Sequence, residues 1–116
     1  MQYLCLICSP EDYYSRLSEE EMGGLYQAYV DYDQAVTEAG ILVDSNRLQP
    51  SSTATSVRVR DGETLTTDGP YADTKEQCGG YYLFSCEDLD EALSWAAKIP
   101  SAAYGTVEVR PVMEDL

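Results

Sequence analysis

Residues 79–86 read GGYYLFSC, and they are followed by EDLDEALSWAAKIP at 87–100 and by TVEVRPV at 106–112. Large apolar or aromatic side chains fill consecutive positions of the first segment, which is typical of a strand buried on both faces. Tyr81 and Leu83 share one face of this strand, and Tyr82 and Phe84 share the other. We therefore expect a central strand over 79–86.

The two segments that follow complete a strand-helix-strand unit. Asp88 with Glu91 is typical of a helix start, and Pro100 of a helix end. The apolar residues expected on its inward side are Leu89, Ala92, Leu93 and Ala96. Val107 and Val109 alternate with polar residues over 106–112, which predicts a returning strand with both valines facing the helices.

The first third of the chain repeats this order. Residues 2–8 are almost continuously apolar and predict a second central strand. Ser18 and Glu21 form a capping box, and Gly40 is a helix stop, so we expect a helix over 19–39 and a strand over 41–48. The apolar stripe expected along this helix consists of Met22, Leu25, Tyr26, Tyr29, Val36 and Ala39.

A hairpin is inserted between the two units. Asp61-Gly62 between 56–60 and 63–67 is a strong signal for a tight turn between antiparallel strands. The sequence thus predicts an α+β fold of ferredoxin-like split βαβ type, with an antiparallel sheet, an inserted β-hairpin and one domain over 1–116.

Composition excludes several classes of function. Seven Lys and Arg against 21 Asp and Glu give a formal charge of -14, which repels nucleic acid and anionic lipid. We find neither a leader pattern nor an apolar run long enough to cross a membrane, and we expect a cytoplasmic protein. The four cysteines are expected to be reduced, with Cys5 and Cys8 on opposite faces of their strand, so that we expect neither zinc nor another cofactor.

The apolar second face of the sheet predicts self-association. Two helices cover only one face of a four-stranded sheet, yet the strands at 2–8 and 79–86 carry large apolar side chains on both faces. A second copy packed sheet to sheet is the simplest cover, so we expect a homodimer. The alternative is a monomer that uses a tyrosine-lined open face for a ligand, and the ten tyrosines fit either interpretation.

The segment DGPYADTKEQ at 68–77, followed by GGYY at 79–82, carries a family resemblance. It resembles the signature of the DGPF subgroup of YCII-related proteins, with Tyr71 in place of the usual Phe. Supporting segments are NRLQP at 46–50, SVRVRDG at 56–62 and YGTVEVRP at 104–111. The resemblance spans nearly the whole chain.

The resemblance implies a dimeric α/β barrel, related to muconolactone isomerase and to cofactor-free monooxygenases. The founding YCII branch has a proposed catalytic pair, a histidine on the first helix and an aspartate that precedes a proline after the second helix. This chain has no histidine, and Ile99 precedes Pro100. The histidine-aspartate mechanism therefore does not transfer to it.

In the absence of histidine, carboxylates, tyrosine, lysine and cysteine remain for general acid-base chemistry. Glu108 and Arg110 alternate with the inward valines and should face the second side of the sheet, where Arg47 is expected to join them. We expect a cleft that binds a small anionic or polar molecule, with Asp68 or Glu108 as a desolvated base. Its predicted lining residues are Arg47, Asp68, Tyr71, Lys75, Glu108 and Arg110.

Two structural interpretations compete with this cleft. In the first, the charged residues form an internal ion-pair network that only orders the dimer. In the second, the 68–76 segment is a plain turn, with Lys75 and Glu76 paired on the surface.

The sequence leaves two functions open. The first is a small-molecule-binding homodimer with its cleft between the sheet and the DGPY loop, acting as a cofactor-free isomerase, dehydratase or oxidative enzyme. The second is a non-catalytic regulatory or interaction protein, for which the resemblance points to an extracytoplasmic-function sigma factor as the partner.

Overall fold

The structure is a computed structural model that describes residues 1–114, so the last two residues of the expected domain lie outside the described residues. The strands are β1 (Gln2–Ser9), β2 (Leu42–Arg47), β3 (Thr55–Arg60), β4 (Glu63–Asp68), β5 (Gln77–Ser85) and β6 (Thr106–Pro111). The α-helices are α1 (Glu19–Glu38) and α2 (Leu89–Ala96), and the short 3-10 helices are η1 (Glu11–Arg16), η2 (Ser51–Thr53) and η3 (Pro100–Ala103).

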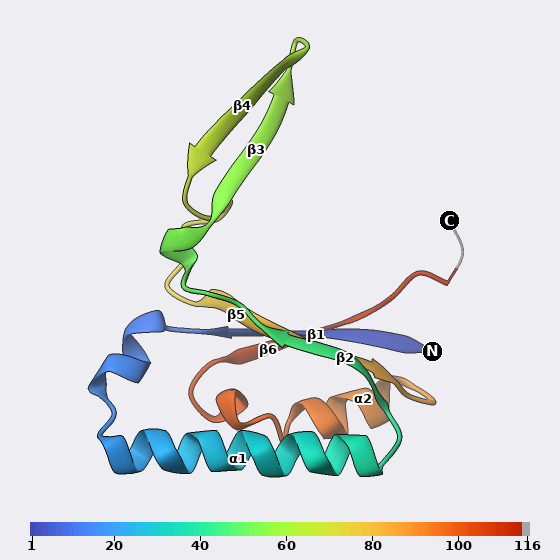
Figure 1. The fold of residues 1–116 in the computed structure, drawn as a ribbon. Coiled ribbons are helices and arrows are strands. Elements are labelled where there is room, and N and C mark those ends of the chain that lie inside the picture. The colour runs from blue at the N-terminus through green and yellow to red at the C-terminus, as the bar shows by residue number, and fades with distance from the viewer. Residues whose placement is uncertain (115–116) are drawn as a thin grey trace.

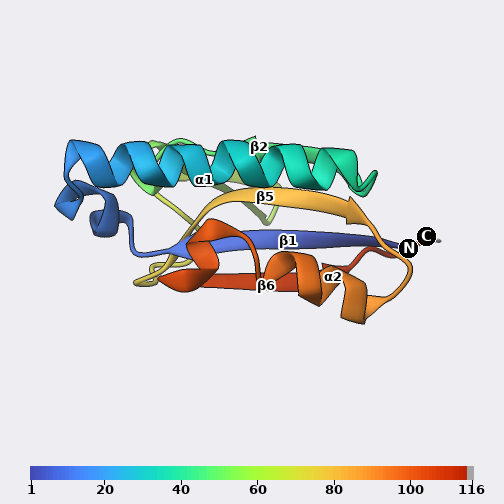
Figure 2. The same cartoon turned by 90° about the horizontal axis from the view of Figure 1, so that it is seen from below.

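A four-stranded antiparallel sheet forms the body, with the strand order β2-β5-β1-β6. Both α-helices cover the same face of this sheet (Figures 1 and 2). The order and the one-sided helices are those of a ferredoxin-like fold, so the predicted fold class is confirmed.

The core lies between the sheet and the helices. Its fully enclosed side chains include Cys5 from β1, Phe84 from β5 and Val36 from α1, each 0% exposed. Val107 and Val109 of β6 pack against this core, as the alternation along the strand predicted. Glu108 and Arg110 are therefore directed to the opposite face of the sheet.

The first helix begins as its sequence predicted, because Ser18 and Glu21 form both hydrogen bonds of a capping box. The expected stripe is wrong at Met22, Tyr26 and Ala39, which are exposed, the first two to 40% and 64%. The buried side chains of α1, Tyr32 and Val36, both lie in its second half.

The second helix approaches the sheet through small side chains. Ala92 and Ala96 are buried, whereas Leu89 and Leu93 are 44% and 45% exposed. The two leucines were expected inside. In this short helix the two alanines face the core, and the two leucines lie beside this contact, partly in solvent.

The second face of the sheet is open in a single chain. Cross-strand pairs Leu4–Leu83 and Leu6–Tyr81 lie on this face, and all four side chains are only half-buried. Burial on both faces was expected for β1 and β5, but one chain supplies the cover for one face only.

The inserted hairpin forms a separate two-stranded sheet, β3-β4, that projects away from the body on the side opposite the helices (Figure 1). Asp61 and Gly62 have positive φ angles of 50° and 78°, as a tight hairpin turn requires. We call residues 55–68 the arm. The arm gives the chain a radius of gyration of 16.2 Å, whereas a compact domain of this length has about 13 Å.

Among the described residues, no helix is both long and apolar enough to span a membrane.

Candidate functional site

The open face of the sheet carries a cluster of polar side chains. Arg110 and Glu108 form an ion pair of 2.6 Å on β6, with 70% and 50% of their side chains exposed. Across the sheet, the Tyr81 hydroxyl donates to Asp44 Oδ2 at 2.8 Å and accepts from Asn46 at 2.9 Å. The pair at Glu108 is exposed in one chain and is not an enclosed ion-pair network.

Arg47 does not join this cluster. It lies opposite Gly80, and the neighbouring Ser45 lies opposite the buried Tyr82, so Arg47 is on the helix side of the sheet. The reason is a β-bulge between Leu42 and Asp44, which shifts the alternation of β2 by one residue.

The base of the arm is closed by backbone contacts. The Gly69 N–H donates to the Ala54 carbonyl at 2.8 Å, and the Ser56 hydroxyl donates to the Gly69 carbonyl at 2.9 Å. Gly69 has a φ of 108°, a conformation that favours glycine. Asp68 ends β4 opposite Thr55 at this base.

A shallow depression of about 530 Å³ follows β3 from this base. It is lined by residues 54–60 with Pro70 and Tyr71, and its charged lining side chains are Arg58 and Arg60. Tyr71 is 84% exposed, so its ring is free to contact a ligand. The lining itself thus carries two positive charges, and Glu63 lies directly opposite Arg60 on the neighbouring strand.

A second depression of about 560 Å³ lies on the other side of Pro70. Its lining residues are Pro10, Glu11, Asp12, Ser51, Ser52, Pro70, Asp73, Thr74, Lys75 and Gln77. Lys75 is its only basic lining residue, against three carboxylates. The lining therefore carries no net positive charge that could attract an anion.

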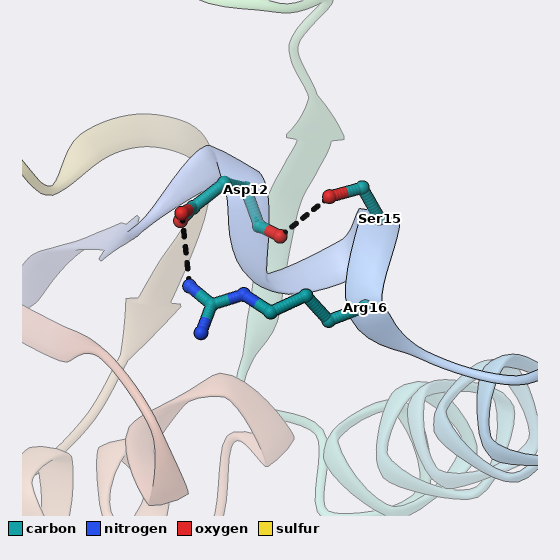
Figure 3. Close-up of polar contacts among 3 residues, drawn as sticks. All are labelled: Asp12, Ser15 and Arg16. Carbon is teal, nitrogen blue, oxygen red and sulfur yellow. Dashed lines mark hydrogen bonds and ion pairs between the residues drawn. The ribbon is translucent and has the colours of Figure 1, made fainter.

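The carboxylates of η1 in the second depression are already engaged. Glu11 accepts hydrogen bonds from the Ser51 hydroxyl at 2.5 Å and the Ser51 N–H at 2.7 Å, and these bonds lower the pKa of Glu11. Asp12 accepts from Arg16 at 2.9 Å, and the Ser15 hydroxyl donates to the Asp12 carbonyl at 2.7 Å (Figure 3). The Glu11–Ser51 bonds join η1 to η2, whereas the contacts of Asp12 lie within η1.

The six predicted site residues therefore do not lie together on one chain. Glu108 and Arg110 are paired on the open face, while Tyr71 and Lys75 line different depressions that share Pro70. Asp68 lines neither depression. A single cleft would require a second chain to bring these surfaces together.

Sequence reasoning missed the two arginines of the arm. The register pairs Arg58 with Leu65 and Arg60 with Glu63, so both arginines project from the same face of the hairpin. Val57 and Val59, opposite Thr66 and Thr64, lie on the other face, which carries Asp68 at the base of the arm. The alternation VRVR at 57–60 was the available signal.

It also missed a chain of hydrogen-bonded hydroxyl groups on the helix side. Ser101 contacts both Tyr29 and Tyr104, Tyr104 donates to Tyr14 at 3.0 Å, and Tyr14 is 3.1 Å from the hydroxyl of Ser9. Burial raises the pKa of Tyr29 and of Tyr104. Because every link is satisfied within the protein, we interpret the chain as a structural tie between η1, α1 and η3.

The fold and these surfaces define a ferredoxin-like α+β protein with an arm inserted between its two halves. Residues 1–115 match the family model of the YCII-related domain. The chain belongs to the YCII-related family, as its sequence predicted.

One relative and one solved structure are similar to the chain. It is 39% identical over 114 residues to an uncharacterized protein of Rhizobium meliloti (strain 1021), covering 97% of this chain and 92% of the relative. Its structure is similar to 5-chloro-2-hydroxyhydroquinone dehydrochlorinase (TftG) from Burkholderia phenoliruptrix AC1100, solved in complex with 2,5-dihydroxybenzoquinone. The TM-score is 0.56 at 15% identity, covering 99% of this chain and 96% of the other, which shows a shared fold.

Proposed function

We propose that this chain is a cytoplasmic, small-molecule-binding homodimer of the DGPF type, with its ligand held at the arm beside the DGPY loop. The observation that carries the proposal is the depression along β3, where Arg58 and Arg60 are the charged lining side chains and Tyr71 adds an exposed ring. The ligand is a small planar molecule with a carboxylate or another acidic oxygen.

The charge of the chain supports this ligand class. A formal charge of -14 opposes an anion over most of the surface, so an anion binds only where positive charge is concentrated. Arg58 and Arg60 supply such a place, and a guanidinium holds a carboxylate through two parallel hydrogen bonds. The Tyr71 ring offers a flat apolar surface for an aromatic or conjugated ligand.

A thermal-shift screen of carboxylates, phenols and hydroxyquinones tests the proposal. Arg58→Gln should weaken binding of a hit about tenfold or more, since a hydrogen bond to a charged group contributes roughly 1.5–3 kcal/mol. Lys98→Gln is the matched control, because it removes one positive charge from a residue stacked on Trp95, at the end of α2. Hits that bind Arg58→Gln and the wild type equally would exclude this site, as would a screen without hits.

Catalysis would require a base near this ligand. Asp68 at the foot of the arm and Glu108 on the open face are the candidates. A cofactor-free isomerase, dehydratase or oxidative enzyme fits a site of arginine, tyrosine and carboxylate side chains. Incubation of each hit with the protein tests this, since conversion that is lost in Asp68→Asn or Glu108→Gln supports an enzyme.

The exposed valines of the arm favour a second candidate, a non-catalytic protein that binds an extracytoplasmic-function sigma factor. Val57 and Val59 are 61% and 59% exposed, which suits a protein contact. A sigma factor that copurifies in a fixed ratio, and is lost in Val59→Lys, would support this candidate. Ligand turnover without such a partner would exclude it.

A further inference from the structure

We propose that Cys8 and Cys78 are a redox-sensitive pair, in which a hydroperoxide closes a disulfide between β1 and β5 on the open face of the sheet. This modification site goes beyond the proposed function, which gives the two cysteines no role. It depends neither on the ligand of the arm nor on the homodimer.

The register of the sheet sets the two cysteines opposite one another. Cys8 of β1 and Cys78 of β5 are direct partners in the antiparallel ladder. Directly opposite residues in such a ladder have Cα atoms about 4.5–5.5 Å apart. A disulfide joins residues whose Cα atoms are roughly 4.4–6.8 Å apart. The backbone spacing of this pair is therefore suited to a disulfide.

A β-bulge brings both side chains to the same face. The β1–β5 ladder passes over Gly79, an extra residue of β5 that lies between the partners of Ile7 and Cys8. In a regular register Cys78 would lie opposite Ser9, whose side chain is buried on the helix side. Because of the bulge, Cys78 instead shares the open face with Cys8.

The two thiols also influence one another. Burial raises the pKa of Cys8 above its ordinary value of 9.0, and the charge of Cys78 and a side-chain hydrogen bond with it raise this pKa further. The carboxylates of Glu108 and Glu76 act in the same direction. Because the thiolate is the form that attacks an oxidant, a raised pKa slows oxidation at neutral pH. The pair therefore stays reduced until an oxidant is present.

The other two cysteines are placed differently. Cys5 and Cys86 are 0% and 4% exposed and belong to the core, whereas Cys8 and Cys78 are half-buried. The partner of Cys5 on β5 is Tyr82, which has no thiol. Cys8 and Cys78 are thus the cysteines that a small oxidant reaches and that face a thiol in register.

Hydrogen peroxide supplies the balance of the reaction. The thiolate of one cysteine attacks the peroxide, so that an S–O bond forms, the O–O bond breaks and hydroxide leaves as water after protonation. The other thiol then attacks the sulfenic sulfur, an S–S bond forms, and the remaining oxygen leaves as a second water. Two thiols are oxidised and one peroxide is reduced. A dithiol reductant reverses the step and returns both hydrogens.

The disulfide would fasten one end of the DGPY loop, residues 68–76. The side-chain amide of Gln77, the residue before Cys78, donates to the carbonyls of Ala72 and Thr74, both at 3.0 Å. A bond at Cys78 therefore joins β1 to β5 at the point where this loop enters the sheet. We expect the amides at 77–80 to exchange their hydrogens more slowly in the oxidised chain than in the reduced chain.

Peroxide treatment of the folded full chain, followed by mass spectrometry, tests the pair. The intact mass should fall by two hydrogen atoms, and alkylation after unfolding should label two thiols in place of the four free cysteines. Cys8→Ser and Cys78→Ser should each abolish this loss. Cys5→Ala and Cys86→Ala are the matched controls and should retain it. Four labelled thiols after peroxide, a bond between two chains, or a bond that persists in Cys8→Ser would overturn the proposal.

Urea unfolding of the oxidised and reduced chains tests the geometry of the bond. The oxidised chain should unfold at a higher urea concentration, because a closed loop of about 70 residues restricts the unfolded chain. A dithiol reductant should return the midpoint to that of the untreated protein. A lower midpoint in the oxidised chain would show that the bond strains the bulge, and it would contradict the spacing on which the proposal rests.

Discussion

At the scale of the residue, the neighbouring glycines Gly79 and Gly80 of β5 have very different surroundings. A Cβ at position 80 would lie 2.8 Å from the Asn46 carbonyl oxygen and 3.4 Å from the Arg47 Cα, whereas a Cβ at position 79 meets nothing within 4 Å. Gly80 thus marks a close approach of the β2 and β5 backbones.

Alanine substitutions should separate the two glycines. We expect Gly80→Ala to lower the free energy of unfolding by about 1–3 kcal/mol, because the backbone of β2 must move to accommodate the methyl group. Gly79→Ala is the matched control and should change it by less than about 1 kcal/mol. Urea unfolding followed by circular dichroism measures both. Equal effects would show that the β2–β5 approach is wrongly placed.

A second residue pair isolates the hydroxyl chain. Tyr13 and Tyr104 stack with ring centroids 3.9 Å apart, but only the Tyr104 hydroxyl bonds to Ser101 and Tyr14. Tyr104→Phe should destabilise the fold by about 1–3 kcal/mol, because buried partners lose their bonds. Tyr13→Phe keeps the stack and should be nearly neutral. If chemical unfolding shows the same stability for both variants, the chain is not a structural tie.

Single residues were the part of the site that the sequence predicted least well. The opposite directions of Cys5 and Cys8 and the outward direction of Glu108 and Arg110 follow from regular alternation, and the register confirms them. Arg47 was misplaced because a β-bulge reverses the alternation, and a bulge leaves no mark in residue type. Ser9 and Ser101 are polar residues whose burial depends on contacts far apart in the chain.

At the scale of the element, the arm is a separate two-stranded sheet with two exposed valines. We expect the second copy of the proposed homodimer to cover these valines. A charge at Val59 would then be taken out of water without a partner, which costs several kcal/mol.

Val59→Lys should therefore raise the dissociation constant of the dimer by tenfold or more, since about 1.4 kcal/mol corresponds to tenfold. Met22→Lys is the control, because Met22 is also an exposed apolar residue but lies on α1, on the helix side. Sedimentation over a range of concentrations measures both constants. An unchanged dimer in Val59→Lys would show that the face of the arm with Val57 and Val59 is not an interface.

Elements with local signals were predicted well. The capping box of α1, the Asp61-Gly62 turn and the alternation of β6 are fixed by neighbouring residues, and each is found in the structure. The 3-10 helices η1 and η3 were missed, because both are held by tertiary hydrogen bonds rather than by helical spacing. The direction in which the arm projects is likewise set by the Ala54–Gly69 junction and not by its own strands.

At the scale of the whole molecule, buried acids make the fold sensitive to alkali. Burial raises the pKa of Cys5 and of Cys86 to about 11, from an ordinary value of 9.0. Burial also raises the pKa of Tyr32 and of Tyr82. These groups stay protonated in the folded chain at a pH where the unfolded chain has already released its protons.

Stability should accordingly be retained below pH 9 and fall between pH 9 and pH 11, because the folded state binds more protons than the unfolded state in this range. Urea midpoints measured across this range test the direction, and Cys5→Ala should fall less steeply than the wild type. A midpoint that stays level or rises across this range would contradict the burial of these groups.

The fold class follows from the order of strands and helices. The residues predicted for one cleft lie on separate surfaces of one chain, so the proposed function rests on a homodimer. The account therefore depends most on the homodimer. Light scattering at micromolar concentration measures it directly: we predict a mass of twice the 12.9 kDa of the chain. A single-chain mass at every concentration would contradict the account.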